Sequence, residues 1–562
     1  MSMLHVGARL EVVAPRRISD RRDWGYLLAL LLISLLVHGW QIYQNRITAK
    51  DSIGFARYGW NLLHPNKGQS PGPPRSAVLV VQENHHPPGF PLMVGLAAEL
   101  VRPFYDKPLP DQLTLASQVA SALAALLLVI PTYALGKLLF NRGVGFGVAL
   151  LLQFLPVFAR EATDGLNDCA HLCFVAFALL FAARGLRRPR VGQFLLVGIF
   201  SGLAFMVRPE GLEVVLALTI TTIGFVVTKR WPLRPTIGLF VALGVGTLLI
   251  SAPYMMVIGK FTNKPSGDIG TPTVNPRANL MKASSLVGGP PFAAAYRDLG
   301  FTDRLTRTPV EFAKEVLKTT HYSIAILGVI GLWFLRPRLK EQPELWLLIV
   351  YAGLHTLLLF TLGLAKGYLS ERHTLPLAMC LTYFAVAGLK PLCEWLTRLP
   401  LIGSLYAQSW MPCLIVGLIV ASCVPPLFKT RHQGRLGQVH AGEYLRGKID
   451  EADQLFDPYE WAGFYSERTL YRIPADPYMT TGRARWIVWE DGDAINSLQS
   501  LRWDETKAYL AAGLADKRAE LMFESNVPNV KNLIRVYRIP FTADEVARDV
   551  LRKKADEEAK PK

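Results

Sequence analysis

The stretch "TIGLFVALGVGTLLISAPYMMVIG", Thr236 to Gly259, carries no charged residue. A transmembrane helix needs about 20 consecutive, predominantly apolar residues, and this stretch is long enough to form one. A similar run, "WGYLLALLLISLLVHGW", covers Trp24 to Trp40. Further apolar runs alternate with short polar connections along the first three quarters of the chain. The pattern therefore predicts a polytopic α-helical membrane protein.

The apolar runs place the predicted membrane spans. We expect about 11 transmembrane helices, with a range of about 11–13, because each run is close to the length that a bilayer requires. The candidate spans are 24–41, 112–135, 143–159, 168–183, 192–207, 211–228, 236–259, 321–335, 344–364, 373–389 and 409–427.

The charge distribution predicts the topology. The formal net charge is +17, and much of the excess lies in short loops such as "ARGLRRPRVG" and "TKRWPLRPT". Short basic loops face the cytoplasm in membrane proteins, so we expect a cytoplasmic N-terminus that begins with an uncleaved signal anchor. The long loop 42–111 and everything after about residue 428 then lie outside. This explanation of the positive charge argues against a nucleic-acid partner.

One short apolar run does not fit the span pattern. "ENHHPPGFPLMVGLAAELV", Glu83 to Val101, begins with two prolines that break a regular helix and continues with too few apolar residues to cross a bilayer. If 89–101 crossed the membrane, every later basic loop would change sides. We therefore expect 89–101 to be an outer surface or re-entrant helix.

The polar C-terminal part predicts a separate unit. We divide the chain into a transmembrane domain, 1–429, and a small extracytoplasmic α/β domain, 430–562, with a charged helical tail from Ala543. The segments "EWAGFYSERTLYR", "RWIVWED" and "NLIRVYRIP" are typical of short strands or turns, and "SLQSLRWDETKAYLAAGL" of a helix. Its aromatic residues are expected to form its core, or alternatively a sugar platform.

The six cysteines lie in or beside apolar segments. Their spacing matches neither a metal site nor a disulfide framework. We expect Cys169 and Cys173, which are four residues apart, to be small residues that face the core.

Ionisable residues collect at the outer ends of the predicted spans. Because such residues are costly at a membrane edge, they mark a candidate site. Each group has a simpler explanation. Arg208 and Glu210 could form an ion pair within a local turn. The long side chains of Glu371 and Arg372 could simply reach the membrane–water interface. Asp164 could cap the N-terminus of a helix. The gathered residues are Asp51, His85, His86, Arg160, Glu161, Asp164, Asp168, Arg208, Glu210, Lys366, Tyr368, Glu371, Arg372 and His373.

Acidic and basic groups at one membrane edge suit sugar transfer from a polyprenyl-phosphate lipid. The phosphate leaving group needs cations, whereas the acceptor hydroxyl needs a carboxylate to take its proton. One such base permits direct displacement with inversion at the sugar carbon.

The order of several motifs resembles the GT-C superfamily of bacterial integral-membrane glycosyltransferases, which includes relatives of protein O-mannosyltransferases and lipid A aminoarabinose transferases. The motifs are Asp51 after the first span, "HPP" at His86 to Pro88, "LLFNRGVGFGVALL", "REATDGLND", "GLAFMVRPEG" and "ERHTLPLA". The resemblance covers nearly the whole chain. Ser52 follows Asp51, so the paired acidic motif of the mannosyltransferases is absent, which argues against protein O-mannosylation.

The resemblance implies roles for individual residues. Asp51 would be the catalytic base, and Arg372, Arg208 and Lys366 would bind the donor phosphate. Asp164 or Asp168, with Glu161, would hold the acceptor or a divalent cation, which the resemblance permits but does not require. The remaining candidates would line the site: His85, His86, Tyr58 and Glu210.

The expected partners are a polyprenyl-phosphate sugar, membrane lipids and a lipid, glycan or protein acceptor, at the bacterial cytoplasmic membrane. The alternative function is a transporter or flippase of lipid-linked saccharides. The chain shows no internal repeat, a common feature of transporters. A second alternative, a membrane anchor for the C-terminal domain, would not require the acidic cluster.

Overall fold

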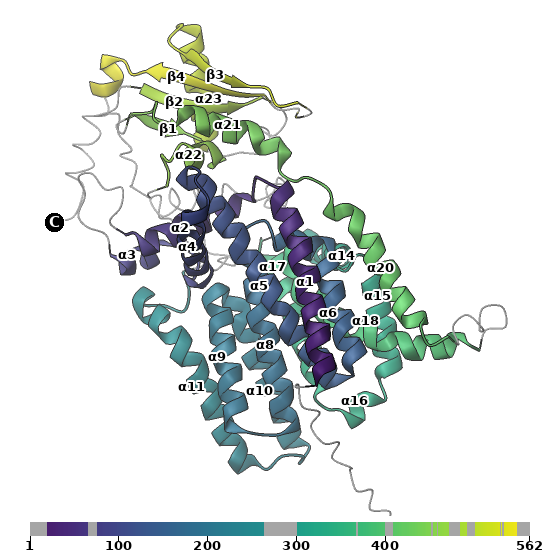
Figure 1. Ribbon diagram of the computed structural model, residues 1–562. Coiled ribbons are helices and arrows are strands. Elements are labelled where there is room, and N and C mark those ends of the chain that lie inside the picture. Colours follow the sequence, from purple (N-terminus) through teal and green to yellow (C-terminus); the bar gives the residue numbers. More distant parts are fainter. Residues whose placement is uncertain are drawn as a thin grey trace, which may run out of the picture.

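The protein is a bundle of apolar helices with a small mixed sheet at one end (Figure 1). The computed structural model describes residues 20–65, 76–263, 301–366, 369–398, 408–450, 453–457, 459–470, 484–491, 501–528, 530 and 533–547. Within these ranges the chain is mostly helical, as the sequence predicts.

Among the described residues, seven helices are long and apolar enough to cross a membrane. Two of them, α10 and α18, are preceded by single 3-10 turns. The seven are α1 (Arg21–Gln44), α5 (Leu109–Leu139), α8 (Asp168–Arg187), α10 (Glu213–Val227, after η2 at Pro209–Leu212), α11 (Leu233–Ile258), α17 (Leu345–Lys366) and α18 (Leu375–Leu396, after η3 at Glu371–Thr374).

Shorter apolar helices complete the bundle. They are α6 (Arg142–Phe154), α9 (Val191–Val207) and α20 (Met411–Leu427). Helices α14 (Phe301–Thr319) and α15 (Ser323–Leu335) meet at a bend of 99°. Each of the predicted spans coincides with one of these apolar helices. The multi-pass architecture is confirmed, and the number of spans stays a prediction.

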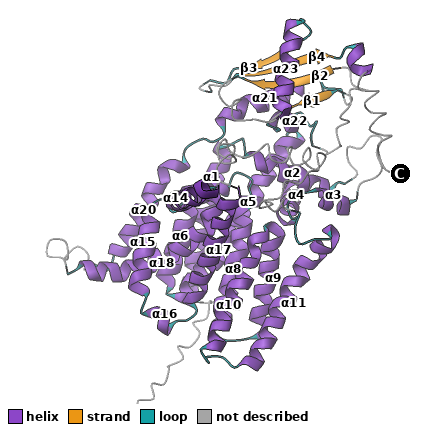
Figure 2. Cartoon of the chain, turned by 180° about the vertical axis from the view of Figure 1, so that it is seen from behind, coloured by secondary structure: helices purple, strands orange, loops and turns teal. Residues whose placement is uncertain are grey.

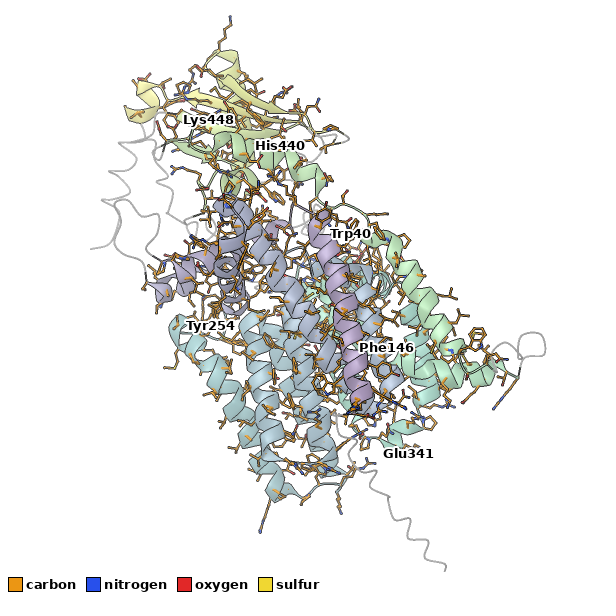
Figure 3. The ribbon with its side chains drawn as sticks, viewed as in Figure 1. Trp40, Phe146, Tyr254, Glu341, His440 and Lys448 are labelled. Carbon is orange, nitrogen blue, oxygen red and sulfur yellow. The ribbon has the colours of Figure 1, made fainter. Side chains whose placement is uncertain are left out.

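The two ends of the bundle differ in what they carry. Helix α1 begins at the end where α16 (Arg338–Glu341) lies, and the C-terminal sheet stands at the opposite end (Figure 1). Glu341 accordingly lies far from His440 and Lys448 (Figure 3). The start of α1 and the C-terminal sheet therefore lie at opposite ends of the bundle, and their placement on opposite sides of a membrane stays a prediction. The direction of insertion stays a prediction.

The loop after α1 forms several short helices at the end of the bundle that carries the sheet (Figure 2). They are α2 (Lys50–Leu63), α3 (Ala77–Glu83), α4 (Gly89–Val101) and η1 (Arg102–Phe104). Helix α4 starts directly after Pro88, as the proline break predicts, and ends after 13 residues. The expected short helix at 89–101 is therefore present, and α2 and α5 pack against it.

The C-terminal region contains a four-stranded sheet in the order β1-β2-β4-β3. The strands are β1 (Gln454–Phe456), β2 (Ala484–Glu490), β3 (Glu520–Ser525) and β4 (Ile534–Pro540). Only β1 and β2 are parallel; the other neighbours are antiparallel. Helix α21 (Leu436–Leu445), after η4 (Gln433–Arg435), covers one face, and α23 (Leu501–Ala515) covers the other, because alternate residues of β2 contact each helix.

The segment "EWAGFYSERTLYR" is a correction to the sequence prediction. Its first part forms a short helix, α22 (Trp461–Tyr465), which was not predicted, and the predicted turns follow as far as Leu470; no strand lies among its described residues. Trp461 and Tyr465 are buried because α22 packs against α21 and the membrane helix α5. Trp486 of β2 is also buried, so these aromatic residues belong to the core. The predicted tail beyond residue 547 lies outside the described residues.

The cysteines behave as the sequence predicts. All six are free, and only Cys413 among them is exposed. The buried five lie in apolar helices, where a thiol packs as a small hydrophobic group.

Candidate functional site

Asp51 and Arg372 meet at the end of the bundle that carries α2, α3 and α4. Asp51 lies in the first turn of α2, and Arg372 lies in η3, just before α18. The Arg372 Nη2 atom is 2.9 Å from Asp51 Oδ2. Two residues predicted to act as base and phosphate ligand are therefore in direct contact, although they come from distant parts of the sequence.

Helix α2 is fixed in place on two sides. A Cβ atom at Gly59 would overlap the carbonyl oxygen of Pro91, so α2 and α4 can touch only through a glycine. On the other side, Arg57 pairs with Glu460 at 2.8 Å, which ties α2 to the C-terminal region. Asp51 consequently projects from a helix held by both neighbours.

A second, buried ion pair joins the start of α8 to the end of α9. Arg208 donates to Asp168 Oδ1, and its Nε lies 3.7 Å from Glu210 Oε2. Asp168 and Arg208 are largely buried. The predicted local pair between Arg208 and Glu210 is thus present, but the closer partner of Arg208 is Asp168.

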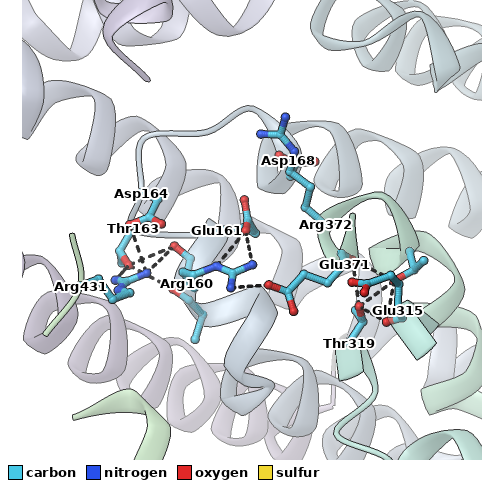
Figure 4. A network of polar contacts seen from close by, with 12 residues as sticks. Arg160, Glu161, Thr163, Asp164, Asp168, Glu315, Thr319, Glu371, Arg372 and Arg431 are labelled. Atoms are coloured by element: carbon cyan, nitrogen blue, oxygen red, sulfur yellow. Dashed lines mark hydrogen bonds and ion pairs between the residues drawn. The ribbon is translucent and has the colours of Figure 1, made fainter. Parts of the chain in front are cut away.

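Arg160 links two carboxylates beside these pairs (Figure 4). It lies in α7 (Pro156–Glu161) and contacts Glu161 at 2.8 Å and Glu371 at 2.6 Å. Burial raises the pKa of Glu161 to about 7, although the Arg160 guanidinium opposes this shift. Arg372 also interacts electrostatically with Asp168 and Glu161. Arg372 therefore belongs to a charge network and does not simply extend to the interface.

A pocket opens beside this network, with about 510 Å³ of empty space, part of it open to solvent. Its lining divides into a polar part and an apolar wall. The polar residues are Asp168, His171, Arg208, Glu210, His355, Arg372 and His373, and the apolar ones are Leu172, Leu358, Leu359, Leu362, Leu375 and Pro376. A polar end that holds two arginines, next to an apolar wall, suits a ligand with a phosphate head and a hydrocarbon tail.

Asp164 lies in a different environment from Asp168. Its carboxylate is 3.2 Å from Arg431 Nη1 and 3.1 Å from His432 Nε2, both in the connection after α20. Asp164 is not among the residues that line the pocket. It does not cap α8 either, because α8 begins at Asp168 after Asn167, which corrects that explanation.

Besides Asp164, five predicted site residues do not line the pocket: Asp51, Glu161, His85, His86 and Tyr58. His85 and His86 are exposed on the loop before α4, where the His86 ring packs edge-on against Phe55. Tyr58 is buried in α2. The side chain of Lys366 lies outside the described residues.

The sequence reasoning missed two pocket residues, His171 and His355, together with Glu213 behind them, and it named His373 without giving it a role. His355 Nδ1 is 2.7 Å from Glu213 Oε2. A usable signal was present, because an ionisable residue inside an apolar run is a default candidate for function. His171 and His355 lie inside predicted spans, and Glu213 lies near the start of one.

The predicted acidic ligands do not fit a metal ion. Each carboxylate of Glu161, Asp164 and Asp168 already contacts an arginine. Across the described part of the chain, no three His, Cys, Asp or Glu residues gather closely enough to hold a metal ion. We therefore derive the proposed reaction from the side chains alone.

The comparisons with known proteins agree on the architecture. Residues 85–256 match the family described as dolichyl-phosphate-mannose-protein mannosyltransferase. The structure of ArnT from Cupriavidus metallidurans bound to undecaprenyl phosphate is similar, with 13% identity and a TM-score of 0.53 over 92% of this chain and 98% of ArnT. ArnT in the apo state gives a TM-score of 0.54 at 12% identity, with coverage of 92% and 98%.

The oligosaccharyltransferase of Archaeoglobus fulgidus, in complex with Zn and sulfate, gives a TM-score of 0.50 at 13% identity, with 92% of this chain and 75% of that chain covered. No curated protein sequence matches the chain. At these identities the similarity establishes the fold. The resemblance to the GT-C membrane glycosyltransferases, predicted from the motifs, is confirmed at that level.

Proposed function

We propose that the protein transfers a glycosyl group from a polyprenyl-phosphate-linked donor to an acceptor at the outer face of a bacterial cytoplasmic membrane. The observation that carries the proposal is the contact between Asp51 and Arg372 beside a pocket with an apolar wall. It brings a carboxylate and a phosphate-binding cation to one place in a multi-pass membrane protein with the GT-C fold.

The donor phosphate would bind Arg372 and Arg208. Guanidinium groups bind phosphate through paired hydrogen bonds, and both side chains line the polar part of the pocket. The hydrocarbon tail would lie along the wall that Leu358, Leu359 and Leu362 form on α17. Because Arg372 contacts Asp51 in this structure, phosphate binding would compete for Arg372 and release the Asp51 carboxylate.

Asp51 would then act as the general base. The acceptor hydroxyl oxygen attacks the anomeric carbon, its proton passes to Asp51, and the bond between that carbon and the phosphate oxygen breaks. The electron pair leaves with the phosphate, where the arginines stabilise the charge. A single displacement inverts the configuration at the sugar carbon.

Asp168 is the better candidate than Asp164 for holding the acceptor. Asp168 lines the pocket, and its Oδ2 is buried without a hydrogen-bond partner among the described residues. Glu161 Oε2 is likewise buried without a hydrogen-bond partner among the described residues. Acceptor hydroxyl groups would satisfy both oxygens, since burying an unpaired polar atom costs about 1–3 kcal/mol.

Asp51→Asn tests the assignment of the base. In membranes that carry the acceptor and receive a radiolabelled polyprenyl-phosphate sugar, we expect transfer to fall by about 10²–10⁴. The matched control is Asp111→Asn, because Asp111 is an outer carboxylate at the start of α5 that pairs with Arg46 away from the pocket. It should keep its activity.

Arg372→Ala tests the donor site in the same assay, and we expect a raised KM for the donor. Near wild-type transfer by Asp51→Asn would remove Asp51 as the base. A wild-type protein that moves the lipid-linked sugar across vesicles without any transfer would favour the transporter alternative.

A further inference from the structure

His355 is a buried histidine whose two ring nitrogens both have partners. It lies in the apolar helix α17, among residues that are otherwise mostly hydrophobic. Its Nδ1 is 2.7 Å from Glu213 Oε2, and its Nε2 is 2.9 Å from the carbonyl oxygen of His373. The mechanism proposed above uses neither His355 nor Glu213.

The partners determine where the protons are. A carbonyl oxygen accepts hydrogen bonds and cannot donate them, so Nε2 of His355 must carry a proton and donate to His373. The contact between Nδ1 and Glu213 then requires one more proton, either on the ring or on the carboxyl group. Without that proton, two lone pairs would face each other at 2.7 Å.

The hydrogen bond from His355 ends on the turn that carries Arg372. His373 follows Arg372 directly in η3, so this bond fixes the peptide between His373 and Thr374, one residue beyond Arg372. The hydroxyl of Thr319 donates to the carbonyl of Glu371 at 2.8 Å and supports the preceding residue. The backbone is therefore held before Arg372 by Thr319 and after it by His355. Of these two, His355 lines the pocket.

We propose that Glu213 and His355 are positioning residues that hold the η3 turn, and with it the Arg372 guanidinium, in the geometry that binds the donor phosphate. This inference rests on the proposed function, because it assigns Arg372 to that phosphate. The pair acts through the backbone of His373 and does not touch the reacting atoms. Its effect is therefore expected in donor binding more than in the chemical step.

A purely structural role makes a different prediction. Glu213 begins α10 and His355 belongs to α17, so the contact also fastens two membrane helices. If that were its whole role, its loss would lower stability and the amount of active protein. The donor KM of the molecules that remain folded would not change.

The decisive variants are Glu213→Ala and Glu213→Gln in the full-length protein. A glutamine amide can donate to Nδ1, which leaves Nε2 protonated and still bonded to His373. We expect Glu213→Gln to stay within about twofold of the wild type. Glu213→Ala and His355→Ala should raise the donor KM by about tenfold or more, with a smaller change in kcat, since tenfold corresponds to one lost interaction of ordinary strength.

His38→Ala is the matched control. His38 is also a buried histidine of an apolar helix, and it bonds to Gln153 at 2.8 Å between α1 and α6, away from the pocket. We expect its donor KM to equal that of the wild type even if less protein folds. Equal donor KM values for Glu213→Ala and Glu213→Gln would overturn the inference, and this comparison holds even if His355→Ala does not fold.

Direct binding of undecaprenyl phosphate separates this inference from the function on which it rests. Affinity is measured on the purified full-length variants in detergent. Weaker binding by both Arg372→Ala and Glu213→Ala supports the inference. Weaker binding by Arg372→Ala alone overturns the positioning role and leaves the function intact. Unchanged binding by Arg372→Ala overturns the phosphate site itself, and the positioning role with it.

Discussion

Replacing Arg208 with alanine should destabilise the protein far more than breaking the neighbouring pair between Asp51 and Arg372. The Asp168 side chain is 3% exposed and that of Arg208 is 15% exposed, whereas Asp51 and Arg372 are 45% and 29% exposed. Removing one partner of a buried pair leaves an uncompensated charge and costs about 3–5 kcal/mol. An exposed pair contributes about 0.2–1 kcal/mol.

We therefore expect Arg208→Ala to lower the free energy of unfolding by about 3–5 kcal/mol. Asp51→Asn should lower it by at most about 1 kcal/mol. The double variant Asp168→Asn with Arg208→Gln removes both charges, and so it should recover much of the loss. Its recovery will be incomplete, because Arg208 also contacts Glu210 at 3.7 Å.

The assay is reversible unfolding of the purified full-length variants in mixed micelles, followed by far-UV circular dichroism. A double-mutant cycle gives the coupling free energy between Arg208 and Asp168. Two results would refute the reasoning: a cost for Arg208→Ala no larger than that for Asp51→Asn, or additive effects of the two substitutions at the buried pair.

Two further predictions concern the supports of the site. Gly165 has a φ of +68°, and a Cβ there would overlap the Ser117 hydroxyl; Gly165→Ala should therefore cost at least about 1–2 kcal/mol in the unfolding assay. Gly224→Ala, at a position where a Cβ meets nothing within 4 Å, is the control, and equal stability of the two variants would contradict the expectation. Glu460→Gln breaks the partly exposed pair with Arg57 and should cost less than about 1 kcal/mol of unfolding free energy. A loss of several kcal/mol would mean that the pair fastens α22 to α2 more strongly than its exposure indicates.

The helices of the bundle were readable from the sequence because each depends on a local property. A run such as Thr236 to Gly259 must be helical in a bilayer, since the backbone polar groups find no other partners there. The short helix α4 followed from Pro87 and Pro88 and from its length. The strands β2 and β4 followed from their β-branched and aromatic residues, whereas "EWAGFYSERTLYR" formed a helix because its aromatic residues pack against α5 and α21.

The candidate site was only partly readable. The cost of a charge at a membrane edge marked Asp51, Asp168, Arg208 and Arg372 as worth attention, but the same reasoning marked Asp164, His85 and His86 equally. Composition does not tell which of these residues face a common pocket. Packing decides that, and it turned Asp168 toward the pocket and Asp164 toward Arg431.

By itself, the sequence determined the apolar helices, their order and the end of the bundle where the charges gather, because hydropathy and loop charge act locally along the chain. Only the tertiary structure decided the partners. The contacts of Asp51 with Arg372, and of His355 with Glu213, join helices that are remote in sequence. Which helices become neighbours depends on how their surfaces fit together, and no local property of the chain encodes that fit.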